Sequence, residues 1–118
     1  MRYLLLIYNN EQEYDAMPEA EREADFNNHY AFSRELGESG TMRGGEPLLP
    51  TTTATTVRVR DGKSLTTHGP FAETKEQLSG FYLVECDNLD QAIEWAGKIP
   101  TAQYGSIEIR PVMEIPGA

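Results

Sequence analysis

The sequence contains few of the residues that build covalent or metal-based sites. Its 118 residues include one cysteine and two histidines. The lone cysteine, Cys86, excludes an intrachain disulfide. Because it ends the apolar run from Gly80, we expect a buried structural thiol rather than a nucleophile. No motif places carboxylates beside His29 or His68 to complete a zinc site. The sequence therefore predicts no metal site, and nothing in it indicates a cofactor.

Basic residues and long apolar runs are also scarce. Ten Lys and Arg stand against 19 Asp and Glu, which gives a formal net charge of −9. A surface this acidic repels phosphate backbones and anionic lipids, so we expect neither nucleic acid nor a membrane as partner. The run from Tyr3 to Tyr8 is too short for a signal-peptide core or a membrane span. With no export signal and no cysteine pair, we expect a cytoplasmic protein.

Seven carboxylates lie between Glu11 and Asp25, with Arg22 as the only base among them. Carboxylates suit the start of a helix, where they meet the positive end of its dipole. We interpret the segment as a solvated helix start, with an acidic docking surface as the alternative.

The remaining composition is that of an ordinary globular protein, with 39% apolar and 25% charged residues. The length fits one domain over residues 1–118. Apolar periodicity, turn residues and caps predict the elements of that domain. Strands are expected at residues 2–8, 41–48, 56–60, 63–66, 78–86 and 106–115, and helices at 19–38 and 89–98.

Two local patterns are the clearest. Thr56–Thr66 alternates between apolar and polar residues around Asp61-Gly62, the favoured pair for a two-residue hairpin turn, with Val57 and Val59 expected to face inward. The helix over 89–98 has Asp87 or Asn88 as its N-cap. Its predicted buried stripe consists of Leu89, Ala92, Ile93, Ala96 and Ile99, while that of the first helix includes Phe26, Tyr30, Ser33 and Leu36.

The predicted elements follow one another in a recognisable order. Without the hairpin they read βαββαβ, the order of the ferredoxin-like α+β fold. Both helices would then cover one face of an antiparallel sheet and leave the other face open. Because exposed apolar sheet needs a cover, we expect a homodimer formed by packing two sheets face to face.

His29 and His68 are the candidate acid–base residues. His29 lies on the apolar stripe of the first helix, three residues after Phe26. It is either a hydrogen-bonded core histidine or a general acid or base facing a cleft, because imidazole titrates near neutrality. His68 precedes Gly69-Pro70, and a rigid turn there presents the ring either to a ligand or to water.

The candidate ligand-binding residues are less specific. Glu73 and Lys75 belong to a polar cluster before a core strand, which is either part of a site or a local salt-bridged loop. Arg43 and Arg110 are either anion-binding residues or members of surface ion pairs. Two aromatic residues complete the candidate cleft: Tyr8 and Phe71.

The run His68-Gly69-Pro70-Phe71-Ala72-Glu73-Thr74-Lys75 and its continuation to Tyr82 resemble the signature of the YCII-related superfamily, in its DGPF branch. The first strand, Gly44-Gly45, Thr55–Arg58 and Glu108–Met113 also resemble that family, so the resemblance spans nearly the whole chain. It implies a ferredoxin-like, dimeric α/β-barrel. It also implies a link to extracytoplasmic-function sigma factors, which members of this branch often accompany.

In the wider superfamily a His-Asp pair in a cleft is the proposed active site, and one relative removes chloride from a chlorinated aromatic. Here His68 stands where the motif has Asp, so that the resemblance does not supply a dyad. A rearranged site would pair His29 with His68 or with Glu73.

Three functional hypotheses follow. The loss of the motif Asp and the −9 charge favour a non-catalytic dimer that binds a small molecule, in a regulatory role. The alternative is a small-molecule enzyme, a lyase or dehydrochlorinase, with His29 as general acid or base. A purely structural module is the third.

Overall fold

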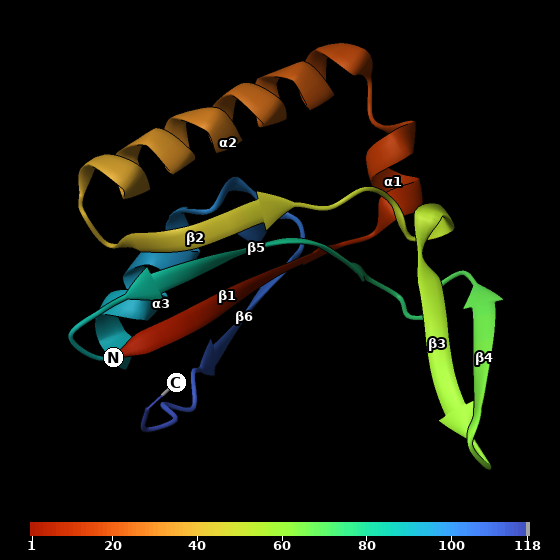
Figure 1. Ribbon diagram of the computed structural model, residues 1–118. Coiled ribbons are helices and arrows are strands. Elements are labelled where there is room, and N and C mark those ends of the chain that lie inside the picture. Colours follow the sequence, from red (N-terminus) through yellow and green to blue (C-terminus); the bar gives the residue numbers. More distant parts are fainter. Residues whose placement is uncertain (118) are drawn as a thin grey trace.

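An antiparallel four-stranded sheet forms the body of the protein in the computed structural model, which describes residues 1–117 (Figure 1). The α+β class is confirmed. The strands are β1 (Arg2–Asn9), β2 (Met42–Pro47), β5 (Gln77–Glu85) and β6 (Ser106–Pro111), in the order β2-β5-β1-β6. The helices are α1 (Glu11–Ala16), α2 (Glu19–Glu38) and α3 (Leu89–Lys98), with short 3₁₀ turns at η1 (Thr51–Thr53) and η2 (Pro100–Gln103).

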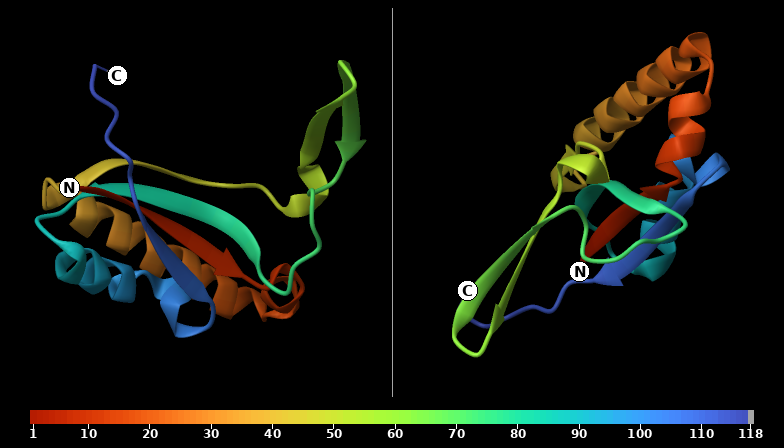
Figure 2. Two further views of the ribbon diagram at one scale, coloured as in Figure 1. Left: turned by 90° about the horizontal axis from the view of Figure 1, so that it is seen from below. Right: turned by 90° about the vertical axis from the view of Figure 1, so that its right-hand side faces the viewer.

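The helices α2 and α3 cover one face of this sheet and leave the other open (Figure 2). In β1, Tyr3, Leu5 and Ile7 are buried beneath the helices, whereas the alternate residues are only half-buried. Leu4 and Leu6 therefore point to the open face, opposite Leu83 and Phe81 of β5. Within residues 1–117, both of these helices lie on one face of the sheet, as predicted.

The core lies where the second half of α2 meets the sheet. Phe32 and Leu36 are buried there, and Phe32 packs edge-on against Tyr82 at 5.3 Å and Trp95 at 6.1 Å between ring centroids. From the other side of the core, the segment that starts with α3 buries Ala92, Ala96 and Ile99.

The predicted stripes were partly wrong. Phe26 and Tyr30 of α2 are 67% and 62% exposed, and Leu89 and Ile93 of α3 are about half exposed. The first half of α2 rises away from the sheet (Figure 1), so helical spacing alone does not bury its apolar residues. The residue that takes their place in the core, Phe32, lies two positions after Tyr30 and was not predicted.

Several helix and strand ends agree with the sequence, and others do not. The α3 N-cap is Asn88, whose side-chain oxygen accepts from the Gln91 amide at 2.9 Å. Helix α1 was not predicted, because its six residues are too few to show periodicity. Strand β6 ends at Pro111 rather than at residue 115; proline has no N–H to donate to the ladder.

The predicted hairpin forms, but it stands apart from the body. Strands β3 (Thr55–Arg60) and β4 (Lys63–His68) pair with each other in a separate two-stranded sheet. Asp61 and Gly62 occupy the turn with φ of 51° and 73°. Val57 and Val59 do not face inward, because each is 60% exposed. We call residues 55–68 the arm.

None of the helices in the described residues 1–117 has the length and apolar character needed to cross a membrane.

The sheet and the segment before β6 approach closely at Gly105. A Cβ atom at this position would lie 2.2 Å from the Tyr8 carbonyl oxygen and 2.9 Å from the Thr101 side chain. We expect Gly105→Ala to lower the free energy of unfolding by about 1–3 kcal/mol, because a backbone atom has to move. Urea denaturation provides the measurement.

Gly97 in α3 is the matched control. A Cβ there meets nothing within 4 Å, so that Gly97→Ala should raise stability by up to about 1 kcal/mol through the better helix propensity of alanine. Equal effects of the two substitutions would contradict the packing described here.

Candidate functional site

A pocket of about 500 Å³ lies between the first half of α2, helix α1 and the helix-covered face of the sheet. Phe26 and Tyr30 of α2 border it on one side, and Pro47, which ends β2, and the adjacent Leu48 on another. The residues that α2 fails to bury against the sheet thus become the apolar wall of a cavity. A mostly apolar cavity with a few convergent polar groups is the usual form of a small-molecule site.

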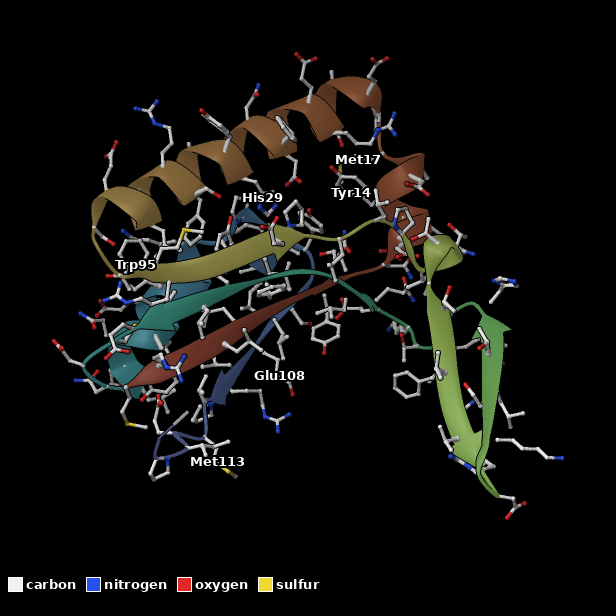
Figure 3. All side chains as sticks on the ribbon, viewed as in Figure 1. Tyr14, Met17, His29, Trp95, Glu108 and Met113 are labelled. Atoms are coloured by element: carbon white, nitrogen blue, oxygen red, sulfur yellow. The ribbon has the colours of Figure 1, made fainter. Side chains whose placement is uncertain are left out.

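His29 of α2 lines this pocket and lies on the side of the helix that faces the sheet (Figure 3). Its Nε2 lies 3.0 Å from Thr101 Oγ1 and 3.5 Å from Asp25 Oδ2. Asp25 precedes His29 by one helical turn, and η2 brings in Thr101 from the far end of the chain. The side chains of His29 and Asp25 are 25% and 13% exposed. The imidazole is therefore held by one hydroxyl and one carboxylate, both shielded from bulk water.

Burial lowers the pKa of His29 from its ordinary value, and the negative charge of Asp25 opposes that shift without cancelling it. The imidazole is thus neutral at neutral pH and able to accept a proton. Once protonated, it would be an imidazolium beside a carboxylate. A neutral base with a charge partner for its conjugate acid is a common arrangement in proton transfer.

One tyrosine is bonded to Asp25, and a second feels its charge. The Tyr104 hydroxyl donates to Asp25 Oδ2 at 3.1 Å. Burial raises the pKa of Tyr104 to about 12, so it stays protonated and keeps donating. Burial and the charge of Asp25 also raise the pKa of Tyr14, which lines the same pocket. Because these phenols stay neutral, they add no negative charge beside His29 to that of Asp25.

Further polar groups line the deeper part of the pocket. The hydroxyls of Ser33 and Tyr82 are hydrogen-bonded to each other. The Asn9 amide oxygen is buried and accepts no hydrogen bond from the residues described. A bulge beside Asn9 shifts the β1–β5 register between Ile7 and Tyr8. These groups offer a ligand several hydrogen-bonding positions.

A clamp joins one wall of the pocket to the root of the arm. The Glu11 carboxylate accepts from the Thr51 backbone N–H at 2.9 Å and from its hydroxyl at 2.7 Å. Glu11 and Pro50 both line the pocket. Helix α1 and the chain that leads into the arm are therefore tied at this point.

Of the two candidate histidines, only His29 lines the pocket. His68 ends β4, where it pairs with Thr55 at the base of the arm. Phe71 is 77% exposed in the loop after the arm. The structure therefore does not place His68 or Phe71 in one cavity with His29.

The other sequence candidates also lie outside the pocket lining. Tyr8 lies on the face of β1 opposite to Ile7, and Glu73 is exposed in the loop before β5. The Lys75 carbonyl accepts from the Asn10 side chain at 3.0 Å. Arg43 donates to the carbonyl of Gly40 at 2.6 Å, near the end of α2. No role for these residues in the pocket follows from their positions.

Sequence reasoning missed Asp25, Thr101 and Tyr104. The spacing of Asp25 and His29, four apart on a predicted helix, was a usable signal. Thr101 and Tyr104 gave none, because only the folded chain brings η2 beneath α2. Within residues 1–117, no three potential metal ligands gather in one place.

Comparison with known proteins gives three findings. A family model described as YCII-related domain matches residues 1–116. An uncharacterised protein from Rhizobium meliloti (strain 1021), R00369, is 40% identical over 114 residues, which cover 95% of this chain and 92% of the relative. Neither finding distinguishes the DGPF branch.

The third similarity is structural. The 5-chloro-2-hydroxyhydroquinone dehydrochlorinase TftG from Burkholderia phenoliruptrix AC1100, solved in complex with 2,5-dihydroxybenzoquinone, aligns with a TM-score of 0.58. The alignment covers 96% of this chain and 94% of that one, at 13% sequence identity. At this identity the similarity concerns the fold alone.

The electrostatics of the pocket predict how His29 titrates. In NMR titration, we expect a His29 pKa below 6.5, and a still lower value in Asp25→Asn, because the carboxylate favours the imidazolium. The spectrum of the His68→Gln variant lacks the His68 signal and so identifies the resonance of His29. A His29 pKa that rises in Asp25→Asn would contradict the arrangement.

The same shift has a consequence for stability. Because the unfolded chain binds a proton at His29 more readily than the folded one, this group destabilises the fold as pH falls from 6.5 through the lowered pKa. We expect His29→Gln to lose less stability than the wild type across that window. Urea denaturation at a series of pH values measures the difference.

Proposed function

The chain belongs to the YCII-related family, and we propose that it binds a small organic molecule in the pocket beneath α2 and removes a proton from it with His29 as general base. The observation that carries the proposal is the neutral, partly buried imidazole of His29 in the pocket wall, 3.5 Å from Asp25. The lowered pKa keeps the base unprotonated near neutrality, where a proton acceptor is needed.

In the proposed reaction, each neighbour of His29 has one role. In the tautomer whose Nε2–H donates to Thr101, Nδ1 carries the lone pair that takes the proton. Asp25 stabilises the imidazolium that results, and Tyr104 holds Asp25 in place through its hydrogen bond. Asp25 and Tyr104 are thus positioning residues, whereas His29 touches the reacting proton.

The pocket and the charge of the chain define the proposed ligand class. Phe26 and Tyr30 offer aromatic surface, and the Ser33–Tyr82 pair and Asn9 offer hydrogen-bonding groups. The net charge of −9 repels anionic ligands and therefore favours neutral ones. A neutral, hydroxylated ring compound fits these constraints. TftG, which shares the fold, acts on 5-chloro-2-hydroxyhydroquinone as its name states, and removal of HCl from such a ring requires a base for the proton.

Binding without turnover, in a regulatory role connected with extracytoplasmic-function sigma factors, is the second candidate. It is favoured by His68, which stands where the resembled motif has Asp and which lies outside the pocket lining. An assay that measures binding and turnover separately distinguishes the two functions.

We expect chloride release from 5-chloro-2-hydroxyhydroquinone, measured with a chloride electrode. In His29→Gln, kcat should fall by a factor of about 10² or more, because the base is lost. In Asp25→Asn, the acidic limb of the pH–rate profile should move to lower pH, following the His29 pKa. His68→Gln is the control and should leave kcat unchanged.

Binding is followed separately through the absorbance of 2,5-dihydroxybenzoquinone. Binding without chloride release would favour the regulatory candidate. The absence of both would contradict the proposed pocket function, and turnover that survives in His29→Gln would exclude His29 as the base.

We also propose that the chain is a homodimer of the ferredoxin-like, dimeric α/β-barrel type. Support comes from the sheet order β2-β5-β1-β6, two helices on one face, and an uncovered face with half-buried Leu4, Leu6, Phe81 and Leu83. A second copy packed on this face would remove those side chains from water.

Leu6→Glu tests this interface, because it places a charge at the centre of the open face while its side chain stays outside the core. We expect sedimentation equilibrium to show a dimer for the wild type and a monomer for Leu6→Glu. Glu13→Ala, on the exposed side of α1, is the control and should remain dimeric. A wild-type monomer at micromolar concentration would refute the dimer.

A further inference from the structure

The arm is a hairpin with little to hold it within its own chain. All six residues of β4 are exposed, and so are all residues of β3 except Thr56. The radius of gyration is 16.4 Å, against about 13.5 Å expected for a compact chain of this length. An isolated two-stranded hairpin is at best marginally stable in water, and its unpaired edges invite pairing with another chain. A folded arm of this kind therefore indicates a surface that covers it.

The two faces of the arm differ in chemistry. Because Val57 pairs with Thr66 and Val59 with Ser64, one face carries the two valines among small hydroxyl side chains. The other face carries Arg58, Arg60 and Lys63. None of these three bases forms an ion pair within residues 1–117.

The charge of the arm is opposite to that of the rest of the chain. The arm holds three of the ten bases and one of the 19 acids, which leaves seven bases and 18 acids elsewhere. A second arm would repel it, whereas the body of another copy would attract it. The same chain therefore provides a partner of the right charge.

The C-terminal segment, residues 112–117, is the matching surface. Met113 is 82% exposed and Ile115 is 64% exposed, the former being the most exposed large apolar side chain described. This segment and the arm both rise on the open side of the sheet, at opposite ends of the molecule (Figure 2). Glu114 of this segment pairs with Arg2, and Glu85 pairs with the N-terminal ammonium, so the attraction for the arm comes from the overall negative charge of the body.

The two-fold axis that relates two face-to-face sheets lies in the plane between them, and its two limiting directions bring different ends together. If it runs along the strands, arm lies beside arm and their bases repel. If it runs across the strands, the ends of the second copy are exchanged, and each arm meets the other copy's C-terminal segment. We propose that the arm of each copy clasps the C-terminal segment of a second copy, with Val57 and Val59 packed against Met113 and Ile115 of that copy. This inference rests on the proposed dimer.

Sedimentation equilibrium on the full chain tests the clasp first. Val57→Thr/Val59→Thr keeps β-branched residues and so preserves the hairpin, but it removes the apolar contact. We expect this double variant, and Met113→Ser/Ile115→Ser, to raise the dimer dissociation constant at least tenfold. Leu65→Thr, on the opposite face of the arm, is the control and should leave the constant within about twofold of the wild type.

Cross-linking then identifies the contact itself. Val59→Cys and Met113→Cys proteins are mixed, treated with a short bismaleimide and analysed by intact mass; Cys86 is buried. We expect the mixed product to predominate, with little product from Val59→Cys alone. Gln12→Cys, exposed on α1, replaces Met113→Cys in the control mixture and should not react with the arm.

The outcomes separate the two proposals. A wild-type monomer would overturn the dimer and the clasp together. If the wild type is a dimer and neither double variant changes its dissociation constant, the clasp alone is overturned. Cross-linking of Val59→Cys mainly to itself would also overturn the clasp alone.

Discussion

The structure depends on a sheet that only two helices cover, on one face and incompletely. Phe32 and Leu36 pack the second half of α2 tightly against β5 and α3. The first half diverges, and the space beneath it becomes the pocket. The same shortage of covering elements leaves the other face open. The sheet thus has more apolar surface than its helices cover, and this one constraint accounts for both the pocket and the open face.

Within the pocket, desolvation and charge act in opposite directions on the same ring. Burial makes the imidazolium of His29 unfavourable, and Asp25 makes it less so. The balance leaves a base that is free at neutral pH and yet has a counter-ion when it is used. Tyr104 keeps that counter-ion in position without competing for the proton, because its own pKa is about 12. The polar groups therefore form a small network rather than a lone histidine on a helix.

Local signals in the sequence predicted local structure well. Asp61-Gly62 predicted the hairpin turn, and Asn88 was one of the two residues predicted to start the helix α3. Burial was harder, because it depends on what faces a residue. Val57, Val59, Phe26 and Tyr30 have the right spacing for a core, yet nothing in the described chain covers them.

The residues of the candidate site also differ in whether the sequence could have predicted them. His29 was identifiable from its place on a helix, and Asp25 from its spacing to His29. The contribution of Thr101 was not, because it lies 72 residues away in sequence and reaches His29 only through the path of the chain around the sheet. The motif around His68 drew attention to a turn that stands at the base of the arm, away from the pocket.

The hydrogen bonds between Glu11 and Thr51 connect helix α1 to the chain that leads into the arm. Glu11 belongs to the wall of the cavity, and Thr51 lies at the root of the arm, whose two six-residue strands reach beyond the body. The cavity wall and the chain that leads into the arm are thus bonded at one point, so that neither can be displaced there without breaking these two hydrogen bonds.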